Sequence, residues 1–426
     1  MKKIICILLM GLLLAGCVQP YDGAQKSDTE ARPTVTVTYY SEPTAEVPQI
    51  QWPEAPVIGG YDDFMAALSD AVLDGTGNKN LSPVSVYLAL AMTAEGARGR
   101  TEAELLSLLG AKDGADMRKT AERLLEELDV QGETGEIALA DSIWMGKQDR
   151  DISFHEAYLN LLKDSYRAEA RAVSFGDPAA GAEIGDWIRE KTREKVKISK
   201  DALQFDAQTL AVLINTIFLK DNWRMPFDEG RTEQGTFYGP NGKTQQAEYM
   251  RRTDRNGIIV RGEGYLRYAL ALNDVGRMVF VLPDEGTTLN SLLSSPEQIA
   301  ALLKDGEEKH ADVDLMVPKF SFQDRTDLEE ILQTLGVRTC FTGGADFSGM
   351  TDVPAHISRV LQESYIGVNE NGVEAAAYTM VVMAKNAAIP EKLEKVDFHL
   401  TRPFLYAIES REGTVLFIGT VVAPEE

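Results

Sequence analysis

The chain has 426 residues, of which 44% are hydrophobic and 26% charged, and its formal net charge is −23. Such an acidic protein is unsuited to binding nucleic acid or a polyanionic cofactor, because both would be repelled. The three cysteines, Cys6, Cys17 and Cys340, are too few for a disulfide scaffold, so an exported domain would be held together by its hydrophobic core.

Residues 1–16 are expected to be a lipoprotein signal peptide. Two lysines precede an apolar run from residue 4 to residue 14, which is too short to span a bilayer. The four residues 14–17 read Leu-Ala-Gly-Cys, the pattern of a bacterial lipobox, in which cleavage precedes a cysteine that receives a diacylglycerol. We therefore expect Cys17 to be lipidated and to hold the protein at the extracellular face of the cell membrane, with release as an alternative.

Residues 17–56 are expected to form a flexible tether. Proline recurs six times between residues 20 and 56, with Ser, Thr and Glu between the prolines. Such a composition cannot bury enough apolar surface to offset the entropy lost on ordering. No second linker follows, so residues 57–426 are expected to form one domain.

The domain begins with helical patterns and ends with strand-like ones. Ser82-Pro83 predicts a helix start, and Thr101 followed by Glu104 predicts a capping box. Helical spacing of apolar residues is found in residues 62–73, 117–128 and 179–194. Strand-like runs cover residues 210–219, 277–282, 313–322, 404–408 and 415–421. This order predicts an α+β fold rather than a doubly wound parallel sheet.

Enzyme motifs are missing from the sequence. The four histidines, His155, His310, His356 and His399, do not have zinc-site spacing, and there is no G-x-S-x-G elbow. The end of a phosphate loop is suggested at residues 242–244, but its first glycine is absent, and a hairpin turn at Asn241-Gly242 explains the segment better. We therefore expect no catalytic activity, no metal and no cofactor.

Residues 370–386 carry the clearest functional pattern. They follow a predicted strand, residues 357–368, and contain small and apolar residues without proline. In an extended chain, one face would present only uncharged residues, at positions 373, 375, 377, 379, 381 and 383. The alanine-rich sequence is equally compatible with a helix or a loop, so the segment is poorly committed to one structure.

Residues 372–377, Gly-Val-Glu-Ala-Ala-Ala, resemble the hinge of the serpin family. Other segments resemble the family in the family's own order and extend the resemblance over about residues 57–423: residues 80–85, 213–227, 317–320, 328–336, 402–404 and 417–419. The resemblance implies the serpin fold, with about eight to nine helices, three β-sheets and an exposed reactive-centre loop at about residues 370–395.

The resemblance also implies a function. Serpins are suicide inhibitors: a serine protease attacks the exposed loop and forms a covalent acyl complex, and the cleaved loop then inserts into the central sheet. The expected partner is therefore a serine protease, bound by a monomer. The alternatives are a non-inhibitory serpin-fold binding protein, an exported hydrolase with an unrecognised site, and a surface adhesin.

The site residues are carried over from the family by position. The hinge would comprise Glu370, Gly372, Val373, Glu374, Ala375, Ala376, Ala377 and Thr379. The region where the sheet opens would comprise Ser82, Pro83, Ser85, Asn215, Trp223 and Gln362, the last in place of a frequent histidine. Hinge length places the scissile bond at Asn386-Ala387, with Lys385, Met383 and Ala384 as alternatives. The apolar residues before this bond favour an elastase- or subtilisin-like protease, and Lys385 would suit a trypsin-like one.

Overall fold

The computed structural model describes residues 54–130, 132–147, 154–196, 211–373 and 393–425, together with residues 203, 205 and 209. The chain divides into two units, Met1–Gln51 and Trp52–Glu426, and all described residues belong to the second. Within them, no helix has both the length and the apolar character needed to cross a bilayer.

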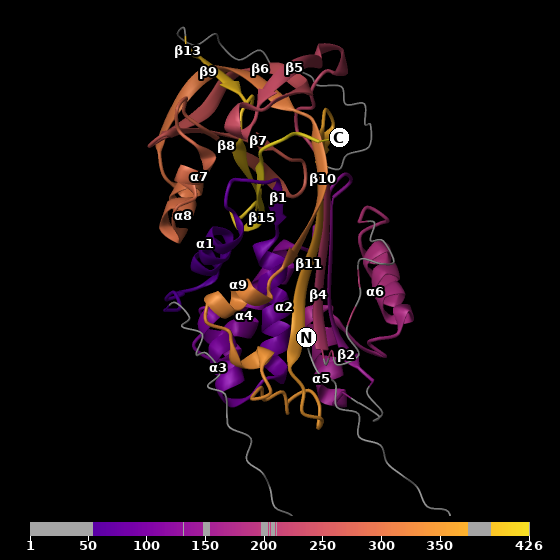
Figure 1. Cartoon of the computed structure of the whole chain (residues 1–426). Coiled ribbons are helices and arrows are strands. Elements are labelled where there is room, and N and C mark those ends of the chain that lie inside the picture. The colour runs from indigo at the N-terminus through magenta and orange to yellow at the C-terminus, as the bar shows by residue number, and fades with distance from the viewer. Residues whose placement is uncertain are drawn as a thin grey trace, which may run out of the picture. The chain divides into compact units, whose positions relative to one another are not determined.

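The main sheet has six strands and forms the long axis of this unit (Figure 1). In spatial order its strands are β10 (Phe320–Asp327), β11 (Ile357–Asn369), β12 (Gly372–Val373), β4 (Ala211–Asn222), β2 (Glu136–Gly146) and β3 (Glu169–Val173). Strand β4 is buried along its length except at Lys220, because both faces of the sheet are covered. The core therefore continues on both sides of this strand.

The second sheet has nine strands. Their bounds are β1 (Lys79–Leu81), β15 (Val415–Val421), β14 (Phe404–Ser410), β8 (Gly276–Pro283), β7 (Tyr265–Ala271), β6 (Thr244–Gly262), β9 (Glu307–Pro318), β13 (Glu394–His399) and β5 (Glu233–Tyr238). Hydrogen bonds join two of the three expected sheets into one, because the 19-residue strand β6 pairs with β5 at one end and with β7 at the other.

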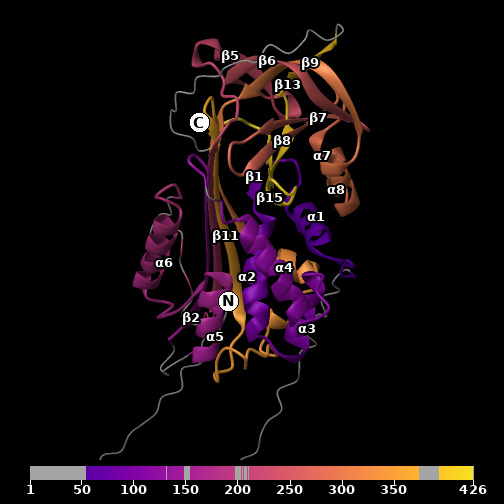
Figure 2. The ribbon, with the colours of Figure 1, turned by 180° about the vertical axis from the view of Figure 1, so that it is seen from behind.

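Helices cover both faces of the main sheet. Their bounds are α1 (Tyr61–Val72), α2 (Pro83–Gly96), α3 (Gly99–Leu108), α4 (Gly114–Glu127), α5 (Glu156–Tyr166), α6 (Pro178–Lys191), α7 (Leu289–Leu292), α8 (Pro296–Lys304) and α9 (Glu329–Thr334), with 3-10 turns at Glu229–Arg231, Pro240–Gly242 and Thr339–Phe341. Figure 2 shows α6 alone on one face and α2 with its neighbours on the other. The expected α+β class is confirmed.

Helix α2 packs directly behind the main sheet and positions the candidate site. Every residue of α2 except Glu95 is buried, so the helix lies in the core rather than at the surface. Ser82 caps it by accepting a hydrogen bond from the Ser85 N–H, and Pro83 occupies the first turn, as predicted. This start places both serines against the sheet.

Two local predictions are wrong. Thr101 and Glu104 do not form a capping box, since α3 already begins at Gly99; the Thr101 hydroxyl instead accepts from the Asp346 N–H. The single strand predicted for residues 313–322 is two strands in different sheets, β9 and β10, which are separated at Lys319. In both cases tertiary partners, which the local pattern does not contain, decide the structure.

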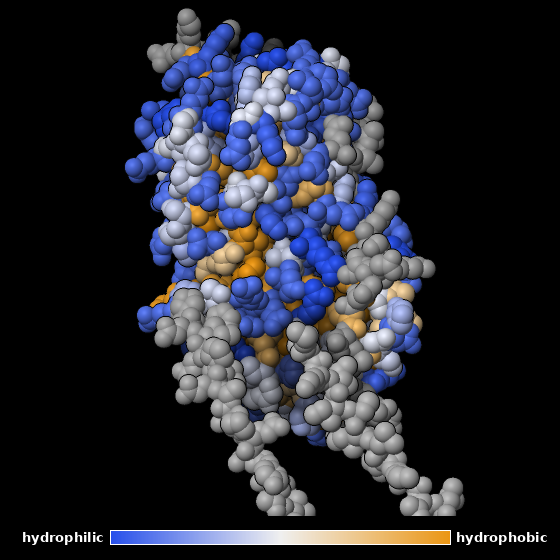
Figure 3. All heavy atoms as spheres, in the orientation of Figure 1, coloured by the Kyte–Doolittle hydropathy of each residue, from blue (hydrophilic) through white to orange (hydrophobic). Residues whose placement is uncertain are grey.

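The surface of the described unit is not uniform. In Figure 3 hydrophilic side chains cover the upper part of the visible face, over β6 and β9, whereas apolar side chains gather in the middle of that face. Large exposed apolar residues are few among the described residues: Val57, Leu159, Met225, Tyr238 and Ile258. Isolated residues of this kind are normal on soluble domains.

Candidate functional site

The hinge begins inside the main sheet. Gly372 and Val373 form β12, which pairs antiparallel with Asn222 and Asp221 of β4 on one side and with the end of β11 on the other. The Val373 side chain is 0% exposed and belongs to the main hydrophobic core. Gly372 and Val373 of the hinge therefore already lie as a short strand between β4 and β11.

Below β12 the sheet is closed. Strands β4 and β11 pair directly and in parallel, from Ala211 beside Ile357 to Ile217 beside Ser364. We call this β4–β11 pairing the seam. An additional strand could enter only by separating it, since hydrogen bonds now join the two backbones along this length.

The rest of the hinge and the reactive bond lie outside the described residues. These are Glu374, Ala375, Ala376, Ala377 and Thr379 of the hinge, and Met383, Ala384, Lys385, Asn386 and Ala387 around the scissile bond. Their roles remain predictions from the sequence.

A polar cluster lies behind the seam, where α2 begins. The Gln362 Nε2 donates to Asn215 Oδ1 (2.9 Å) and to Ser85 Oγ (3.0 Å), and Ser85 Oγ donates to Asn215 Oδ1 (2.5 Å). The Ser82 N–H donates to Gln362 Oε1 (3.0 Å). The structure thus brings together Ser82, Ser85, Asn215 and Gln362, which were expected from separate segments. All four are 1% exposed or less.

Asp141 of β2 belongs to this cluster and was missed by sequence reasoning. Its Oδ1 accepts a hydrogen bond of 2.5 Å from Asn215 Nδ2, and the residue is 3% exposed. Burial raises the pKa of Asp141 to about 7, and the Asn215 hydrogen bond partly opposes that rise. An isolated aspartate in an unassigned segment gives no sequence signal, because the contact depends on the β2–β4 register.

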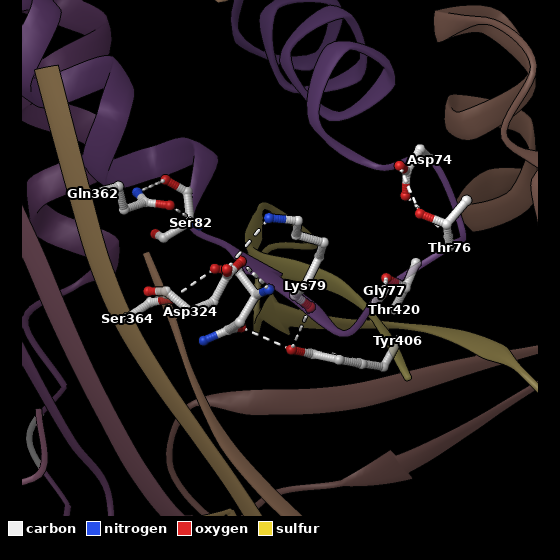
Figure 4. Close-up of polar contacts among 11 residues, drawn as sticks. Asp74, Thr76, Gly77, Lys79, Ser82, Asp324, Gln362, Ser364, Tyr406 and Thr420 are labelled. Atoms are coloured by element: carbon white, nitrogen blue, oxygen red, sulfur yellow. Dashed lines mark hydrogen bonds and ion pairs between the residues drawn. The ribbon is translucent and has the colours of Figure 1, made fainter. Parts of the chain in front are cut away.

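A strap connects the two sheets beside the cluster (Figure 4). Asp324 of β10 accepts from the Asn80 N–H (3.0 Å) and from Lys79 Nζ (3.4 Å), and Ser364 of β11 donates to the Asn80 carbonyl (2.6 Å). On the other side, the Tyr406 hydroxyl of β14 donates to Asn80 Oδ1 (2.8 Å). Strand β1 therefore ties the main sheet to the second sheet just before Ser82.

Trp223 lies apart from the polar cluster, at the base of the hinge. Its Nε1 donates to the Asn369 carbonyl (2.9 Å), and its backbone N–H donates to the Asn371 carbonyl (2.8 Å). The Glu370 carboxylate accepts from the Thr232 hydroxyl (2.8 Å) and lies 3.6 Å from Lys319 Nζ. These contacts hold the turn that leads from β11 into β12.

One group of side chains among the described residues has the spacing of metal ligands. Single ligand atoms of Asp314, Asp397 and His399 lie within 4.8 Å of one another, on β9 and β13. The Arg251 guanidinium lies 3.9 Å from Asp314, so a cation already neutralises part of this group. The group lies on the second sheet, whereas the seam belongs to the main sheet.

The comparisons with known proteins agree with this geometry. A family model described as "Serpin (serine protease inhibitor)" matches residues 60–424. An uncharacterised serpin-like protein of Thermococcus kodakarensis is 30% identical and covers 100% of this chain and 99% of its own length. Serine proteinase inhibitor A3K of Cavia porcellus is also 30% identical, covering 89% of this chain and 92% of its own.

A solved structure gives the same result. Human thyroxine-binding globulin, in complex with its ligand, superimposes with a TM-score of 0.74 at 26% identity, over 86% of this chain and 98% of its own. With a family match across residues 60–424 and a hinge strand between β4 and β11, the chain belongs to the serpin family, whose members are typically protease inhibitors that act on target proteases.

Proposed function

We propose that this protein is an irreversible suicide inhibitor of serine proteases. The observation that carries the proposal is the position of β12: Gly372 and Val373 are already paired with β4 and β11 at the open end of the seam. The protease serine would attack the scissile carbonyl and form an acyl-enzyme. The freed chain would then extend β12 downward between β4 and β11, and displace the bound protease before the ester is hydrolysed.

The pairing of β12 predicts what an inserted strand would meet. If the register of Gly372 with Asn222 and Asn369 continued without a shift, residue 379 would pair with both Asn215 and Gln362. Thr379 would then lie between the two side chains that the opening of the seam separates. Its hydroxyl could accept from Gln362 Nε2 and donate to Asn215 Oδ1, so the polar cluster would keep its hydrogen bonds.

The expected face of the inserted strand is consistent with this register. Alternate residues share a face, so positions 375, 377, 379, 381 and 383 would follow Val373 toward the core. None of these positions carries a charge. Roughly a dozen new backbone hydrogen bonds at about 1 kcal/mol net each would give on the order of 10 kcal/mol, comparable to the stability of a whole domain. The intact form would therefore be kinetically trapped.

The experiment is incubation of the full chain with a panel of elastase-, subtilisin- and trypsin-like proteases. An inhibitor of this kind gives a complex that survives SDS, together with a released carboxy-terminal peptide. The mass of that peptide identifies the scissile bond: Asn386-Ala387 or Met383-Ala384 for the first two classes, and the bond after Lys385 for the third. Cleavage without any stable complex, by every protease tested, would overturn the proposal.

A second candidate function is favoured by a surface pocket of about 550 Å³. It lies between α1, α8 and strands β6, β7 and β8, and combines apolar residues such as Met65 and Val279 with Arg267. Burial lowers the pKa of Arg267, attraction to Glu409 and Glu308 at the pocket partly opposes this, and Nη1 donates to the Leu302 carbonyl (2.7 Å). Such a site would suit an amphipathic carboxylate, and the similar human protein binds thyroxine.

Titration calorimetry with thyroxine and other amphipathic carboxylates tests this alternative. Binding that is lost in Arg267→Gln, together with the absence of any protease complex, would favour a carrier over an inhibitor. The inhibitor proposal is preferred because β12 is already seated in the sheet.

We also propose that Cys17 carries a lipid that holds the protein at the extracellular face of the membrane. The support is the Leu-Ala-Gly-Cys sequence at residues 14–17. Mass spectrometry of the amino-terminal peptide checks this: a diacylglyceryl group on Cys17 is expected, and Cys17→Ser should release the protein from the membrane fraction.

A further inference from the structure

The side-chain amide of Gln362 in the polar cluster behind the seam can adopt only one orientation. The Ser82 N–H donates to Gln362 Oε1, and Gln362 Nε2 donates to the Ser82 carbonyl, both at 3.0 Å. Backbone groups cannot exchange donor and acceptor, so reversing the Gln362 amide would lose both bonds. One N–H of Gln362 Nε2 therefore serves the Ser82 carbonyl, and the other lies within hydrogen-bond distance of both Asn215 Oδ1 (2.9 Å) and Ser85 Oγ (3.0 Å).

The orientation of Gln362 in turn fixes the orientation of the Asn215 amide, which determines its contact with Asp141. Because its Oδ1 is engaged by Gln362 and Ser85, its Nδ2 points the other way and donates to Asp141 Oδ1 at 2.5 Å. The three residues lie in register across the sheet, Asp141 on β2 beside Asn215 on β4 beside Gln362 on β11. Asp141 is therefore the terminal acceptor of a hydrogen-bond chain that crosses the seam.

Asp141 has little to stabilise a negative charge. Its second oxygen, Oδ2, is buried and has no hydrogen-bond partner within the part of the chain that the structure describes. The ionisable side chains of the elements packed against β2 are Tyr87 and Glu95 of α2, Glu169 and Arg171 of β3, Lys220 and Asp221 of β4, and Glu183, Asp186, Arg189, Glu190 and Lys191 of α6. None of them contributes to the rise of the Asp141 pKa to about 7, which comes from burial.

We propose that Asp141 is a positioning residue for loop insertion: it holds the Asn215 amide toward Gln362 while the seam is closed, and the seam opens with release of its proton. Opening separates Gln362 from Asn215 and admits water to a carboxyl group that is otherwise dry, which favours the ionised form. The proton passes from the Asp141 carboxyl to solvent. The coupling is a property of the intact chain, and only its consequence for inhibition rests on the proposed function.

The direction of the pH effect follows from this arrangement. The closed seam keeps Asp141 protonated up to about pH 7, whereas a hydrated carboxyl ionises near its ordinary pKa of about 4. Between these two pH values the open state binds fewer protons than the closed state. The equilibrium constant for opening of the seam should therefore rise with pH, by up to about tenfold for each pH unit. It should level off above about pH 8, where both states are ionised.

Hydrogen–deuterium exchange of the uncleaved full chain tests the proposal without any protease. Protection of the β4 and β11 amides, corrected for the intrinsic exchange rate, is measured from pH 5 to pH 8.5. In the wild-type protein we expect the protection factors of these amides to fall several-fold for each pH unit between pH 5 and about pH 7.5. In Asp141→Asn, which keeps an acceptor oxygen, protection should be independent of pH and within about threefold of the wild-type value at pH 5. Asp141→Ala should exchange faster at every pH, because the Asn215 Nδ2 loses its acceptor.

Glu363 provides the matched control. Burial also raises its pKa to about 7, but Glu363 follows Gln362 directly on β11, so its side chain lies on the opposite face of the sheet, with Oε1 3.3 Å from Arg325 Nε. Glu363→Gln should therefore keep the wild-type pH dependence. A flat wild-type profile, a slope that persists in Asp141→Asn, or a slope lost in Glu363→Gln would each overturn the proposal. If opening of the seam depends on pH as expected but the protein forms no complex with any protease, the role of Asp141 is retained and the proposed inhibitor function is contradicted.

Discussion

Gly372 lies where the backbone of β4 closely approaches that of β12, and its lack of a side chain allows that approach. A Cβ atom built at this position would lie 2.1 Å from the Asp221 carbonyl oxygen, which is backbone and cannot rotate away. Val373, its neighbour, does the opposite and fills a core position with its side chain. The pairing of β12 therefore depends on the missing side chain of Gly372 and on the apolar side chain of Val373.

Gly372→Ala is expected to push β12 away from β4. The clash should lower the free energy of unfolding by about 1–3 kcal/mol, typical of overpacking, and should expose the hinge. If insertion starts from this strand, as proposed, it should be slower in the variant, and more loops should be cleaved for each complex formed. Thermal melting and the stoichiometry of inhibition measure the two effects. Gly343→Ala is the control, since a Cβ there meets nothing within 4 Å; equal behaviour of the two variants would contradict the role given to Gly372.

Glu370→Lys is expected to destabilise the base of the hinge. Glu370 is 7% exposed, and its carboxylate accepts from Thr232 and lies 3.6 Å from Lys319 Nζ. Charge reversal would place two ammonium groups together in a nearly buried site and lower the free energy of unfolding by on the order of 2 kcal/mol. Glu370→Gln keeps an acceptor for Thr232 and should be milder. Denaturant unfolding of the three proteins measures this; equal midpoints would show that the pair contributes nothing.

Among the secondary-structure elements, those that are buried on both faces or periodic along one face could be predicted from the sequence. Strands β4, β11 and β15 and helices α1 and α4 were expected within a few residues of their observed bounds. Strand β2 was not, because Asp141 and Ser142 are polar residues at buried positions and interrupt its apolar pattern. Their hydrogen-bond partners lie on β4, and cross-strand register cannot be derived from a single local segment.

The same limit applies to the candidate site. Ser82, Ser85, Asn215 and Gln362 could be named because each lies in a segment that resembles the family. Their mutual contacts could not, since they join helix α2 to two strands that are more than a hundred residues apart in sequence. Asp141 and Thr232 needed the structure, because no motif contains them.

Two alanine substitutions in the loop test which face an inserted strand would bury. Ala377→Arg puts a charge on the face that follows Val373 into the core, whereas Ala376→Arg puts the same charge on the opposite face. We expect Ala377→Arg to be cleaved as a substrate, with the loss of at least nine-tenths of the SDS-stable complex, because burying an unpaired guanidinium is strongly unfavourable. Ala376→Arg should retain most of it. Intact complex formation by Ala377→Arg would refute the predicted face.

For the molecule as a whole, the proposed function requires two folded states of one chain. The intact state has only two residues of the additional strand in place and is closed below them. The cluster at Gln362 lies behind that closed part and joins β11 to β4, so its hydrogen bonds oppose opening, and the strap at Asn80 lies beside it. If the chain inhibits as proposed, the stability of the intact state would be governed by a barrier rather than by the lowest free energy available to the sequence.

Cleavage of the loop should remove that barrier and raise the melting temperature. A gain on the order of 10 kcal/mol, spread over a domain of this size, corresponds to an increase of at least about 10 °C. The measurement is calorimetry of the full chain before and after a brief digestion that cuts between residues 380 and 390. The Ala377→Arg variant, cut in the same way, should show no increase, because its strand cannot enter the seam. An unchanged melting temperature in the cleaved wild-type protein would mean that β12 does not extend, and the protein would then be a binding module that shares the serpin architecture without its mechanism.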